Sequence, residues 1–367
     1  MKRVGFLYQK MADKNLIRQT IINGSRGKRS RWDVKMVMAD IEGYTNKVYN
    51  LVVNHSYVPT TPKPKYIHDS SSGKLRKIKI VPYYPDGIMH QLVAEVCKPV
   101  FMRGMYRWSC ASIPRRGNMA AVRYLKRALS KKPSRTKYTA KLDIRHYYDN
   151  IDTDNLIAAL ERKIKDKEIL RLIRIIIESD PDDGLSIGFY ICQWLANFFL
   201  EPLDHFITSL DGVNYYVRNM DDMVLCGSNK RKLHRAVFAI SMFLGEMGLE
   251  LKSNWQVFKT DSRGIDFVGY RFFHGYTKLR RRNFLKMARQ SRAIRKKKGQ
   301  EKKISFHSAA GMLSRSGALK HCSGTAIRQK YIDEIGVKSL KEVVREHSRE
   351  LSRMSAGGVV VADGIEA

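Results

Sequence analysis

The sequence lacks the features that would place it in several protein classes. Among its 367 residues, no apolar run approaches the roughly 20 residues that a membrane-spanning helix needs. The N-terminal segment MKRVGFLYQKM has no apolar core of the kind found in signal peptides, so we expect the protein to stay in the cytoplasm. The five cysteines are scattered without a CxxC pair, which favours reduced thiols over a disulfide framework or a zinc site.

Acidic residues are also scarce, with 35 Asp and Glu against 68 Lys and Arg, so the net charge is +33. Because such an excess destabilises a compact chain by self-repulsion, we expect a polyanionic partner, and RNA or DNA comes first. An anionic membrane surface is a weaker alternative, since no amphipathic anchor stands out, and we expect no membrane association. A structural basic protein of the ribosomal type is another explanation of the charge. Such proteins are usually shorter and poorer in aromatic residues than this chain, which has 18 Tyr and 14 Phe.

Strand and helix patterns alternate along the chain, which favours an α+β fold, and a hydrophobic content of 43% argues against disorder. The basic residues 1–35 are interpreted as a mobile arm, or as a surface that becomes ordered on nucleic acid. Spacing and turn residues predict helices at 34–52, 88–102, 155–177 and 232–249, a strand at 138–142, hairpins at 70–87 and 213–227, and a strand pair at 265–273.

Three aspartates follow or interrupt apolar strand segments. Asp143 follows the strand Tyr138–Leu142, and Asp221 and Asp222 lie at the expected tip of the hairpin YYVRNMDDMVLCGSNK. Two adjacent aspartates are common in β-turns, where they bond to turn amides, so the pair alone would indicate a turn more than a metal site. If the two strands are neighbours, however, three carboxylates converge. Phosphoryl transfer by two divalent cations requires such a group, and oxygen ligands of this kind suit Mg²⁺.

Six segments, taken in order from about residue 70 to about residue 325, resemble the motifs of reverse transcriptases. They are KIKIVPYYPDGIMHQ, CASIPRRGNMAAV, LDIRHYYDNID, GLSIGFYICQWLAN, YVRNMDDMVL and IDFVGYRF. Gly188 followed by Gln193 replaces the Gln-Gly…Ser-Pro pattern of the related group II intron-type enzymes. That variation, the compact length and the segments SRGIDFVGYRF and SRSGALKH are most similar to bacterial and phage reverse transcriptases of diversity-generating retroelements, which are also related to defence-associated reverse transcriptases.

The resemblance implies a right-hand polymerase fold with fingers, a palm containing an antiparallel sheet, and a helical thumb. The expected divisions are a basic N-terminal extension and helix (1–70), fingers (71–140), palm with inserted fingers helices (141–275), basic thumb (276–352) and flexible tail (353–367). It also implies an RNA-directed DNA polymerase that makes cDNA by two-metal nucleotidyl transfer, with two Mg²⁺ per active site and Mn²⁺ as a substitute.

The partners implied by the resemblance are an RNA template, a DNA or RNA primer, dNTP, and either a small basic accessory protein or a cognate noncoding RNA. An enzyme of a diversity-generating retroelement would be expected to misincorporate opposite adenine. The first alternative is an antiphage defence enzyme that copies its own noncoding RNA. The second is a catalytically dead scaffold that binds RNA, which the three intact aspartates argue against. The sequence shows no endonuclease signature and no RNase H acid set.

Residue roles also follow from the resemblance. Asp143 and Asp221 match the two principal metal ligands, and Asp222 matches the third carboxylate. Tyr148 stands where the family has a ring that blocks a 2′-hydroxyl and so selects dNTP, although a core aromatic beside Tyr147 is the alternative. Lys252 is assigned to the leaving pyrophosphate.

The remaining nucleotide contacts are expected from the fingers and the glycine loop. Lys77 and Arg76 would grip the triphosphate, while a solvated strand face is the alternative for Arg76 and for Lys79. Gly188 would let the backbone approach the nascent base pair. Gln193 would hydrogen-bond near the template base or the nucleotide, with a helix-capping role as its alternative.

Three positions depart from the family pattern. Asn219 replaces the usual tyrosine before Met220, Ile113 replaces an arginine for which Arg115 and Arg116 are nearby substitutes, and Gly87 stands where an arginine is common. The stretch 278–303 carries thirteen Lys and Arg against one acid, Glu301, and is the expected duplex-gripping helix of the thumb. Its expected nucleic-acid contacts are Arg280, Arg281, Arg282, Lys286, Arg289, Lys296 and Lys297.

Overall fold

The computed structural model describes residues 2–68, 73 and 75–356, the last six of them without their side chains. The chain divides into two compact units, Met1–Ser262 and Arg263–Ala367, which are described separately. The sequence had placed its boundary between palm and thumb later, at 275/276. Within the described residues, no helix is both long enough and apolar enough to span a membrane.

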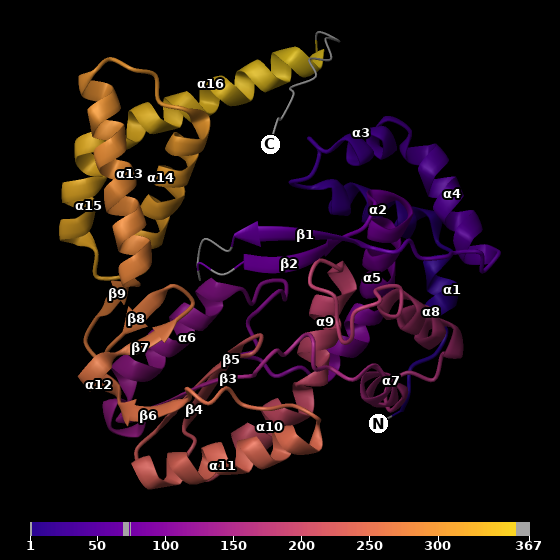
Figure 1. The fold of residues 1–367 in the computed structure, drawn as a ribbon, viewed down its shortest axis with the longest axis horizontal. Coiled ribbons are helices and arrows are strands. Elements are labelled where there is room, and N and C mark those ends of the chain that lie inside the picture. Colours follow the sequence, from indigo (N-terminus) through magenta and orange to yellow (C-terminus); the bar gives the residue numbers. More distant parts are fainter. Residues whose placement is uncertain (1, 69–72, 74, 357–367) are drawn as a thin grey trace. The chain divides into compact units, whose positions relative to one another are not determined.

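A four-stranded antiparallel sheet forms the centre of the N-terminal unit, with strand order β4-β5-β3-β6 (Figure 1). Its strands are β3 (Tyr138–Asp143), β4 (Tyr215–Asn219), β5 (Asp222–Gly227) and β6 (Gln256–Lys259). The strand at 138–142 and the hairpin at 213–227 are thereby confirmed. Strand β5 is buried from Met223 to Gly227, as expected for a central strand covered on both faces.

Helices cover this sheet with apolar faces. In α11 (Lys230–Glu246) the buried residues Leu233, Val237, Ile240 and Leu244 recur at three-to-four spacing, and the helix packs on β3 and β5. The side chain of Asn229 caps its first turn by accepting a hydrogen bond from the N–H of Lys232. Beside it, α10 (Glu201–Ser209) packs on β4 and on α11 (Figure 1).

The rest of the N-terminal unit is mainly helical. The apolar helices α5 (Ile88–Gly104) and α9 (Tyr190–Phe199) pack together, and α5 confirms the helix predicted at 88–102. A two-stranded antiparallel hairpin, β1 (Lys63–His68) with β2 (Leu75–Ile80), stands beside them. The other helices are α1 (Leu7–Met11), α2 (Lys14–Ser25), α3 (Trp32–Ala39), α4 (Ile41–Val53), α6 (Asn118–Lys131), α7 (Thr153–Glu161), α8 (Lys167–Ile177), α12 (Thr260–Arg263) and the short turns η1 (Tyr83–Gly87) and η2 (Pro133–Thr136).

Several sequence expectations need correction here. The prediction of a mobile arm at residues 1–35 is wrong. Helices α1 and α2 bury Leu7, Met11, Ile17 and Ile21 in the core. The single helices predicted at 34–52 and 155–177 are each two helices. They are divided where Asp40 and Asp166 turn out of helical geometry and cap the next helix.

The expected fingers hairpin at 70–87 is only partly right. Its strand at 75–80 is β2, but the partner β1 precedes the expected hairpin and includes Pro64, on a two-stranded ribbon where proline is tolerated. The predicted Ser/Gly turn at 70–73 lies outside the described residues except for Gly73. The tail predicted at 353–367 is helical up to Ala356, and its remainder lies outside the described residues.

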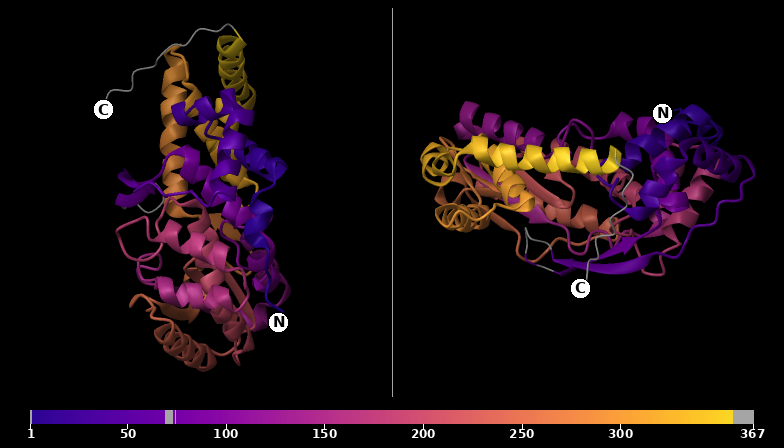
Figure 2. Two further views of the ribbon diagram at one scale, coloured as in Figure 1. Left: turned by 90° about the vertical axis from the view of Figure 1, so that its right-hand side faces the viewer. Right: turned by 90° about the horizontal axis from the view of Figure 1, so that it is seen from above.

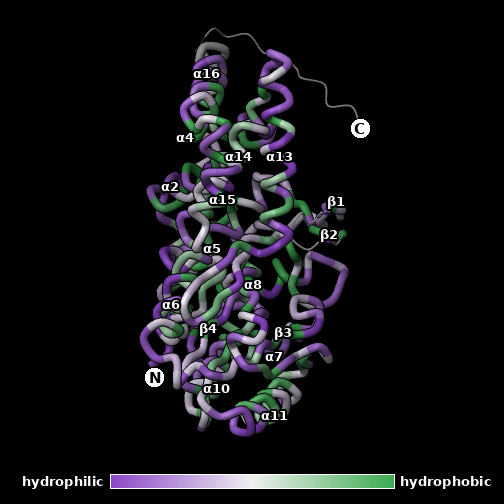
Figure 3. The backbone as a smooth tube through the Cα atoms, turned by 90° about the vertical axis from the view of Figure 1, so that its left-hand side faces the viewer, coloured by the Kyte–Doolittle hydropathy of each residue, from purple (hydrophilic) through white to green (hydrophobic). Residues whose placement is uncertain are grey.

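The C-terminal unit combines a small sheet with a helical layer. Strands β7 (Ile265–Phe267), β8 (Tyr270–Phe272) and β9 (Thr277–Leu279) pair in sequence order, which confirms the strand pair at 265–273. Helix α14 (Phe306–Leu319) packs against both α13 (Arg281–Gly299) and α16 (Val337–Ala356) (Figure 2). The unit also contains α15 (Thr325–Tyr331) and η3 (Asp333–Ile335). Figure 3 shows that α13 is largely hydrophilic.

Candidate active site

The register of the central sheet brings two of the predicted aspartates face to face. Strands β3 and β5 pair so that Asp143 lies opposite Asp222, and Asp221 occupies the turn between β4 and β5. Met220 begins this turn with a φ of 58°, a left-handed conformation that few residues other than glycine adopt without support. The turn therefore needs a scaffold that holds it.

A fully buried ion pair supplies that scaffold. The guanidinium of Arg218 donates to both carboxylate oxygens of Asp204, at 2.7 and 2.6 Å, and both side chains are 0% exposed. The same guanidinium donates to the carbonyl of Met220 at 3.1 Å, and the hydroxyl of Tyr216 donates to Asp204 at 2.7 Å. Arg218 thus ties the turn of Asp221 to α10.

Asp143 is close enough to influence the ionisation of Asp221. Burial and the negative charge of Asp143 together raise the pKa of the Asp221 carboxyl to about 6. Lys252 acts against this shift. A carboxyl whose negative charge is disfavoured in this way, next to a second carboxylate, lies where a cation would be stabilised.

Each end of the aspartate group is also paired with a lysine. The ammonium of Lys252 pairs with Asp143, and its backbone N–H donates to the carbonyl of Asp143 at 2.8 Å. Lys141, two residues before Asp143 on β3, pairs with Asp222 across the sheet. The three aspartates thus lie at one end of the sheet, as the sequence predicted, but Lys252 and Lys141 hold Asp143 and Asp222 in ion pairs. Among the described residues, no set of three or more His, Cys, Asp or Glu side chains is placed to hold a metal ion.

The residues present nevertheless fit a divalent cation. Asp143 and Asp221 offer the hard oxygen donors that Mg²⁺ prefers, and Mg²⁺ needs only one or two protein carboxylates because it keeps several waters. Asp222 lies directly opposite Asp143 in the register, so a rotation of its side chain away from Lys141 would bring a third carboxylate to the same edge.

Tyr148 lies close enough to Asp221 to be affected by its charge. Burial raises the pKa of the Tyr148 hydroxyl, and the negative charge of Asp221 acts in the same direction. Its ring meets that of Tyr147 edge-on, with ring centroids 5.8 Å apart. Tyr147 is buried and its hydroxyl donates to the carbonyl of Ala196, so Tyr147 is the core aromatic of the two, whereas Tyr148 remains partly exposed.

The glycine loop contacts the fingers hairpin directly. The N–H of Lys79 on β2 donates to the carbonyl of Ile187 at 2.7 Å. Gly188 has a φ of 122°, and a Cβ at this position would lie 2.1 Å from the carbonyl oxygen of Lys79. Glycine is therefore required here by the packing of β2, a reason the sequence had not suggested. Gln193 is exposed on α9, without a cap role at the start of that helix.

The fingers lysines are held by a loop that the sequence analysis did not single out. Lys79 donates to Asp180 at 2.5 Å and pairs with Asp182 at 2.7 Å, and it is only 8% exposed. Lys77 pairs with Asp182 at 2.6 Å and is 42% exposed. Lys79 is thus not on a solvated strand face. Lys77 and the exposed Arg76 stand further out on β2, where a ligand can reach them.

The three departures from the family pattern also have structural consequences. The amide of Asn219 donates to the side-chain oxygen of Asn118 at 2.8 Å, which ties the hairpin tip to the start of α6. Ile113 is buried in the core, so it does not replace a nucleotide contact. Gly87 follows Asp86, whose buried carboxylate accepts from the Tyr57 hydroxyl at 2.7 Å.

The basic residues predicted to grip nucleic acid belong to the C-terminal unit. Arg280 donates to Asp266 at 2.6 Å just before α13 begins. Within α13, Met287 and Ile294 face the interior. Arg281, Arg289, Lys296 and Lys297 are exposed, while Arg282 and Lys286 are half-buried. The helix thus presents a cationic face to solvent, as its sequence indicated.

Comparison with known proteins identifies the family of the chain. Residues 67–272, more than half of the chain, match the family described as reverse transcriptase (RNA-dependent DNA polymerase). The chain belongs to the reverse transcriptase family. This membership confirms the expected α+β right-hand polymerase fold, and the family is described as one of RNA-dependent DNA polymerases. The matched region contains both strands that carry the three aspartates.

Two curated relatives share part of the chain. Group II intron-encoded protein LtrA from Lactococcus lactis subsp. cremoris, and the same protein from strain MG1363, are each 24% identical over 173 residues, which is 45% of this chain. The chain spans 28% of the length of these relatives.

Solved structures of telomerase are similar at low identity. Apo telomerase from Candida tropicalis, truncated from its C-terminal domain, is 16% identical, with a TM-score of 0.46 over 63% of this chain and 59% of that one. Telomerase from Candida albicans in complex with a TWJ fragment of telomeric RNA is 12% identical, with a TM-score of 0.49 over 85% and 68% of the two chains.

Proposed function

We propose that this protein synthesises cDNA on an RNA template by adding dNTP to a primer 3′ hydroxyl. One observation carries the proposal: the pairing of β3 with β5 places Asp143 opposite Asp222, with Asp221 in the adjoining turn, in a chain of the reverse transcriptase family. Burial and the negative charge of Asp143 together raise the pKa of the Asp221 carboxyl to about 6. Such a pair is unfavourable for stability unless it serves a cation or a proton transfer.

Asp143 and Asp221, with Asp222 as the third ligand, would hold Mg²⁺ or its substitute Mn²⁺. When bound, two such ions activate the attacking hydroxyl and neutralise charge on the leaving pyrophosphate. The scaffold of Arg218 and Asp204 keeps Asp221 at the turn. Its rigidity matters because a small misplacement of a reacting group lowers the rate strongly.

The surrounding side chains would select and orient the nucleotide. Tyr148 would place a flat ring beneath the sugar, where one additional oxygen clashes, and so favour dNTP over NTP. Lys77 and Arg76 on β2 would contact the triphosphate, with Gly188 and Gln193 lining the base-pair side. Lys252 is tethered through its backbone to Asp143, so its ammonium group remains within reach of the departing pyrophosphate.

Primer extension on an RNA template tests this function. In the presence of Mg²⁺, the wild-type protein should extend a DNA primer, and the double variant Asp221→Asn/Asp222→Asn should not. Asp154→Asn is the matched control, because Asp154 is a surface carboxylate, 79% exposed, that pairs with Arg174. Extension by the double variant at the wild-type rate would show that the site is assigned wrongly. Loss of extension in the control as well would point to a general defect.

We further propose that the enzyme serves a diversity-generating retroelement in the cytoplasm, with a small basic accessory protein and its own template RNA. The segments SRGIDFVGYRF and SRSGALKH support this choice. Sequencing the RNA that copurifies with the protein, together with its cDNA, separates the alternatives. A template matching a variable repeat, with substitutions opposite adenine, supports diversification. A structured noncoding RNA would favour the defence enzyme, and an absence of any dNTP incorporation with the natural RNA would favour a dead scaffold.

A further inference from the structure

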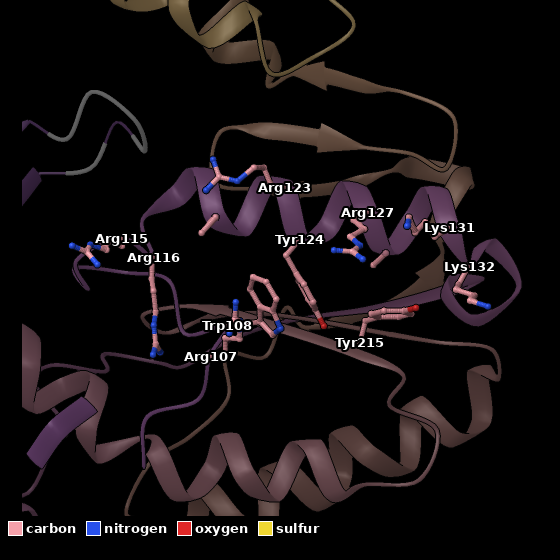
Figure 4. Close-up of a pocket in the computed structure, with 12 residues that line it drawn as sticks. Arg107, Trp108, Arg115, Arg116, Arg123, Tyr124, Arg127, Lys131, Lys132 and Tyr215 are labelled. Carbon is pink, nitrogen blue, oxygen red and sulfur yellow. The ribbon is translucent and has the colours of Figure 1, made fainter. Parts of the chain in front are cut away.

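An open cavity of about 880 Å³ lies beside the central sheet. Its lining includes none of the three aspartates, but it does include Arg115 and Arg116, which were named above as substitutes for an arginine of the family. It is formed by α6, by the edge strand β4 and by the segment that contains Trp108 (Figure 4). All of its lining residues belong to the N-terminal unit. Its size is that of a site for a small ligand or for part of a polymer.

The cavity is strongly cationic. Seven Arg and Lys side chains line it, and among the residues that the structure describes no Asp or Glu does so. Three of these cations, Arg123, Arg127 and Lys131, come from one face of α6 at spacings of four residues. The opposite face of the helix is buried through Val122, Leu125 and Leu129. Because seven cations without a carboxylate repel one another, the cavity is suited to a polyanion.

Aromatic rings form part of its wall. The indole of Trp108 stacks on the ring of Tyr124, with centroids 4.0 Å apart and planes at 25°, and Tyr215 meets Tyr124 edge-on at 6.2 Å. Arg107 lies over the Trp108 ring at 5.5 Å. Figure 4 shows these rings between the cationic side chains of α6 and the sheet.

The rings of Trp108, Tyr124 and Tyr215 form an aromatic platform, and the hairpin of β4 and β5 holds Trp108 in place. The N–H of Arg218 donates to the carbonyl of Trp108 at 3.0 Å, and that of Cys110 donates to the carbonyl of Arg218 at 2.8 Å. Arg116, at one end of the cavity, donates to the carbonyl of Tyr106 at 2.9 Å. Trp108 is therefore fixed against β4, the strand that leads into the turn of Asp221, and the Asn118–Asn219 contact ties α6 to the same strand.

We propose that this cavity is a second nucleic-acid site, which binds an unpaired single-stranded segment next to the polymerase centre. Cations that follow a backbone, interleaved with rings on which bases stack, are the two components of single-strand recognition. A duplex would leave the rings unused, because its bases already stack on each other. The segment would run along α6, from Arg115 near the hairpin tip toward Lys132 at the far end of β4.

Binding of a single-stranded oligonucleotide of about 12 nucleotides, a length typical of such sites, tests the proposal. Fluorescence anisotropy is measured on the full chain without dNTP, so the result does not depend on the polymerase activity proposed above. The cavity variant is Arg123→Ala/Arg127→Ala. Its matched control is Arg231→Ala/Arg235→Ala, which removes two exposed arginines with the same spacing from α11.

We expect the cavity variant to lower the affinity and to reduce the slope of log K against log salt by about 1.4, or about 0.7 for each lost phosphate contact. The control should retain the wild-type slope. The proposal would be overturned if both variants lost the same affinity for the oligonucleotide, or if both kept the wild-type affinity. RNA and DNA oligonucleotides of one sequence distinguish the source, since preference for RNA assigns the segment to the template and preference for DNA assigns it to the product.

The aromatic platform requires its own variants. Trp108→Ala should weaken binding of the oligonucleotide on the order of 10-fold, Trp108→Phe should retain most of it, and neither should change affinity for inorganic polyphosphate, which has no bases. Loss of polyphosphate binding in Trp108→Ala would indicate a general structural defect. In that case the affinity of Trp108→Phe for the oligonucleotide tests the platform, and loss of that affinity with polyphosphate binding intact would contradict it. A 4-thiouridine oligonucleotide should crosslink to the Trp108 or Tyr124 peptide. Crosslinks confined to residues 280–297 would contradict the site.

Discussion

The buried ion pair between Arg218 and Asp204, which holds the turn of Asp221, offers a demanding test of the structure. Substituting Asp204→Asn keeps the shape of the side chain but removes its charge, and it leaves the guanidinium of Arg218 in a position that is 0% exposed. Breaking a buried pair by removing one partner typically costs about 3–5 kcal/mol, because the remaining charge is uncompensated. The Tyr216 hydroxyl also loses a charged acceptor.

Urea unfolding monitored by circular dichroism measures this loss in the full chain. Asp154→Asn makes the same chemical change in an exposed pair and should cost at most about 1 kcal/mol. The double variant Asp204→Leu/Arg218→Met should recover much of the stability, since an apolar pair of similar size carries no desolvation cost. If Asp204→Asn and Asp154→Asn unfold at the same urea concentration, the buried pair does not hold the turn as described.

Three further predictions concern the glycine loop, the fingers and the aspartate pair. Gly188→Ala should reduce stability and primer extension, because its Cβ would lie 2.1 Å from the Lys79 carbonyl, whereas Gly245→Ala, in open space on α11, should be neutral or slightly stabilising in the same assays. Lys79→Met should cost about 3 kcal/mol by leaving a buried carboxylate short of its cation; Lys77→Met should instead raise KM for dNTP with little change in unfolding, and the reverse pattern would exchange their roles. The pKa of the Asp221 carboxyl is raised from 3.8 to about 6. Between these two pH values only the folded chain still holds the proton, so without divalent cations the free energy of unfolding should fall by up to about 3 kcal/mol as the pH rises from the lower to the higher value. The affinity for Mn²⁺ should rise over the same pH range, and Asp221→Asn should remove both trends.

The sequence predicted the strands of the active site because their apolar runs are interrupted by acids at the ends. It could place Asp143 and Asp221 together because antiparallel neighbours bring strand ends to one edge. It could not show that Asp222 pairs with Lys141, since a diagonal contact across two strands depends on register and on side-chain rotation. The Arg218–Asp204 pair was equally hidden, because its partners belong to different elements.

Other differences between the predicted and the observed fold arose because basic charge was given more weight than the spacing of apolar residues. Basic residues dominate the first 35 positions, yet Leu7, Met11, Ile17 and Ile21 are sufficient to bury two helices. The helix breaks at Asp40 and Asp166 had a visible signal, because aspartate is a preferred N-cap. The cationic face of α6 was also present in the spacing of Arg123, Arg127 and Lys131. Its neighbour Trp108, however, reaches that face only through the fold.

The most direct test of the central claim is single-nucleotide incorporation on an RNA template by Asp143→Asn, measured under single-turnover conditions with Mg²⁺. Loss of one principal ligand removes several kcal/mol of transition-state stabilisation, which corresponds to a rate on the order of 10³-fold lower. The account predicts that loss for Asp143→Asn, together with a folded protein and an unchanged rate in Asp154→Asn. A rate within about 10-fold of wild type would contradict the assignment of Asp143 and Asp221 as the catalytic pair.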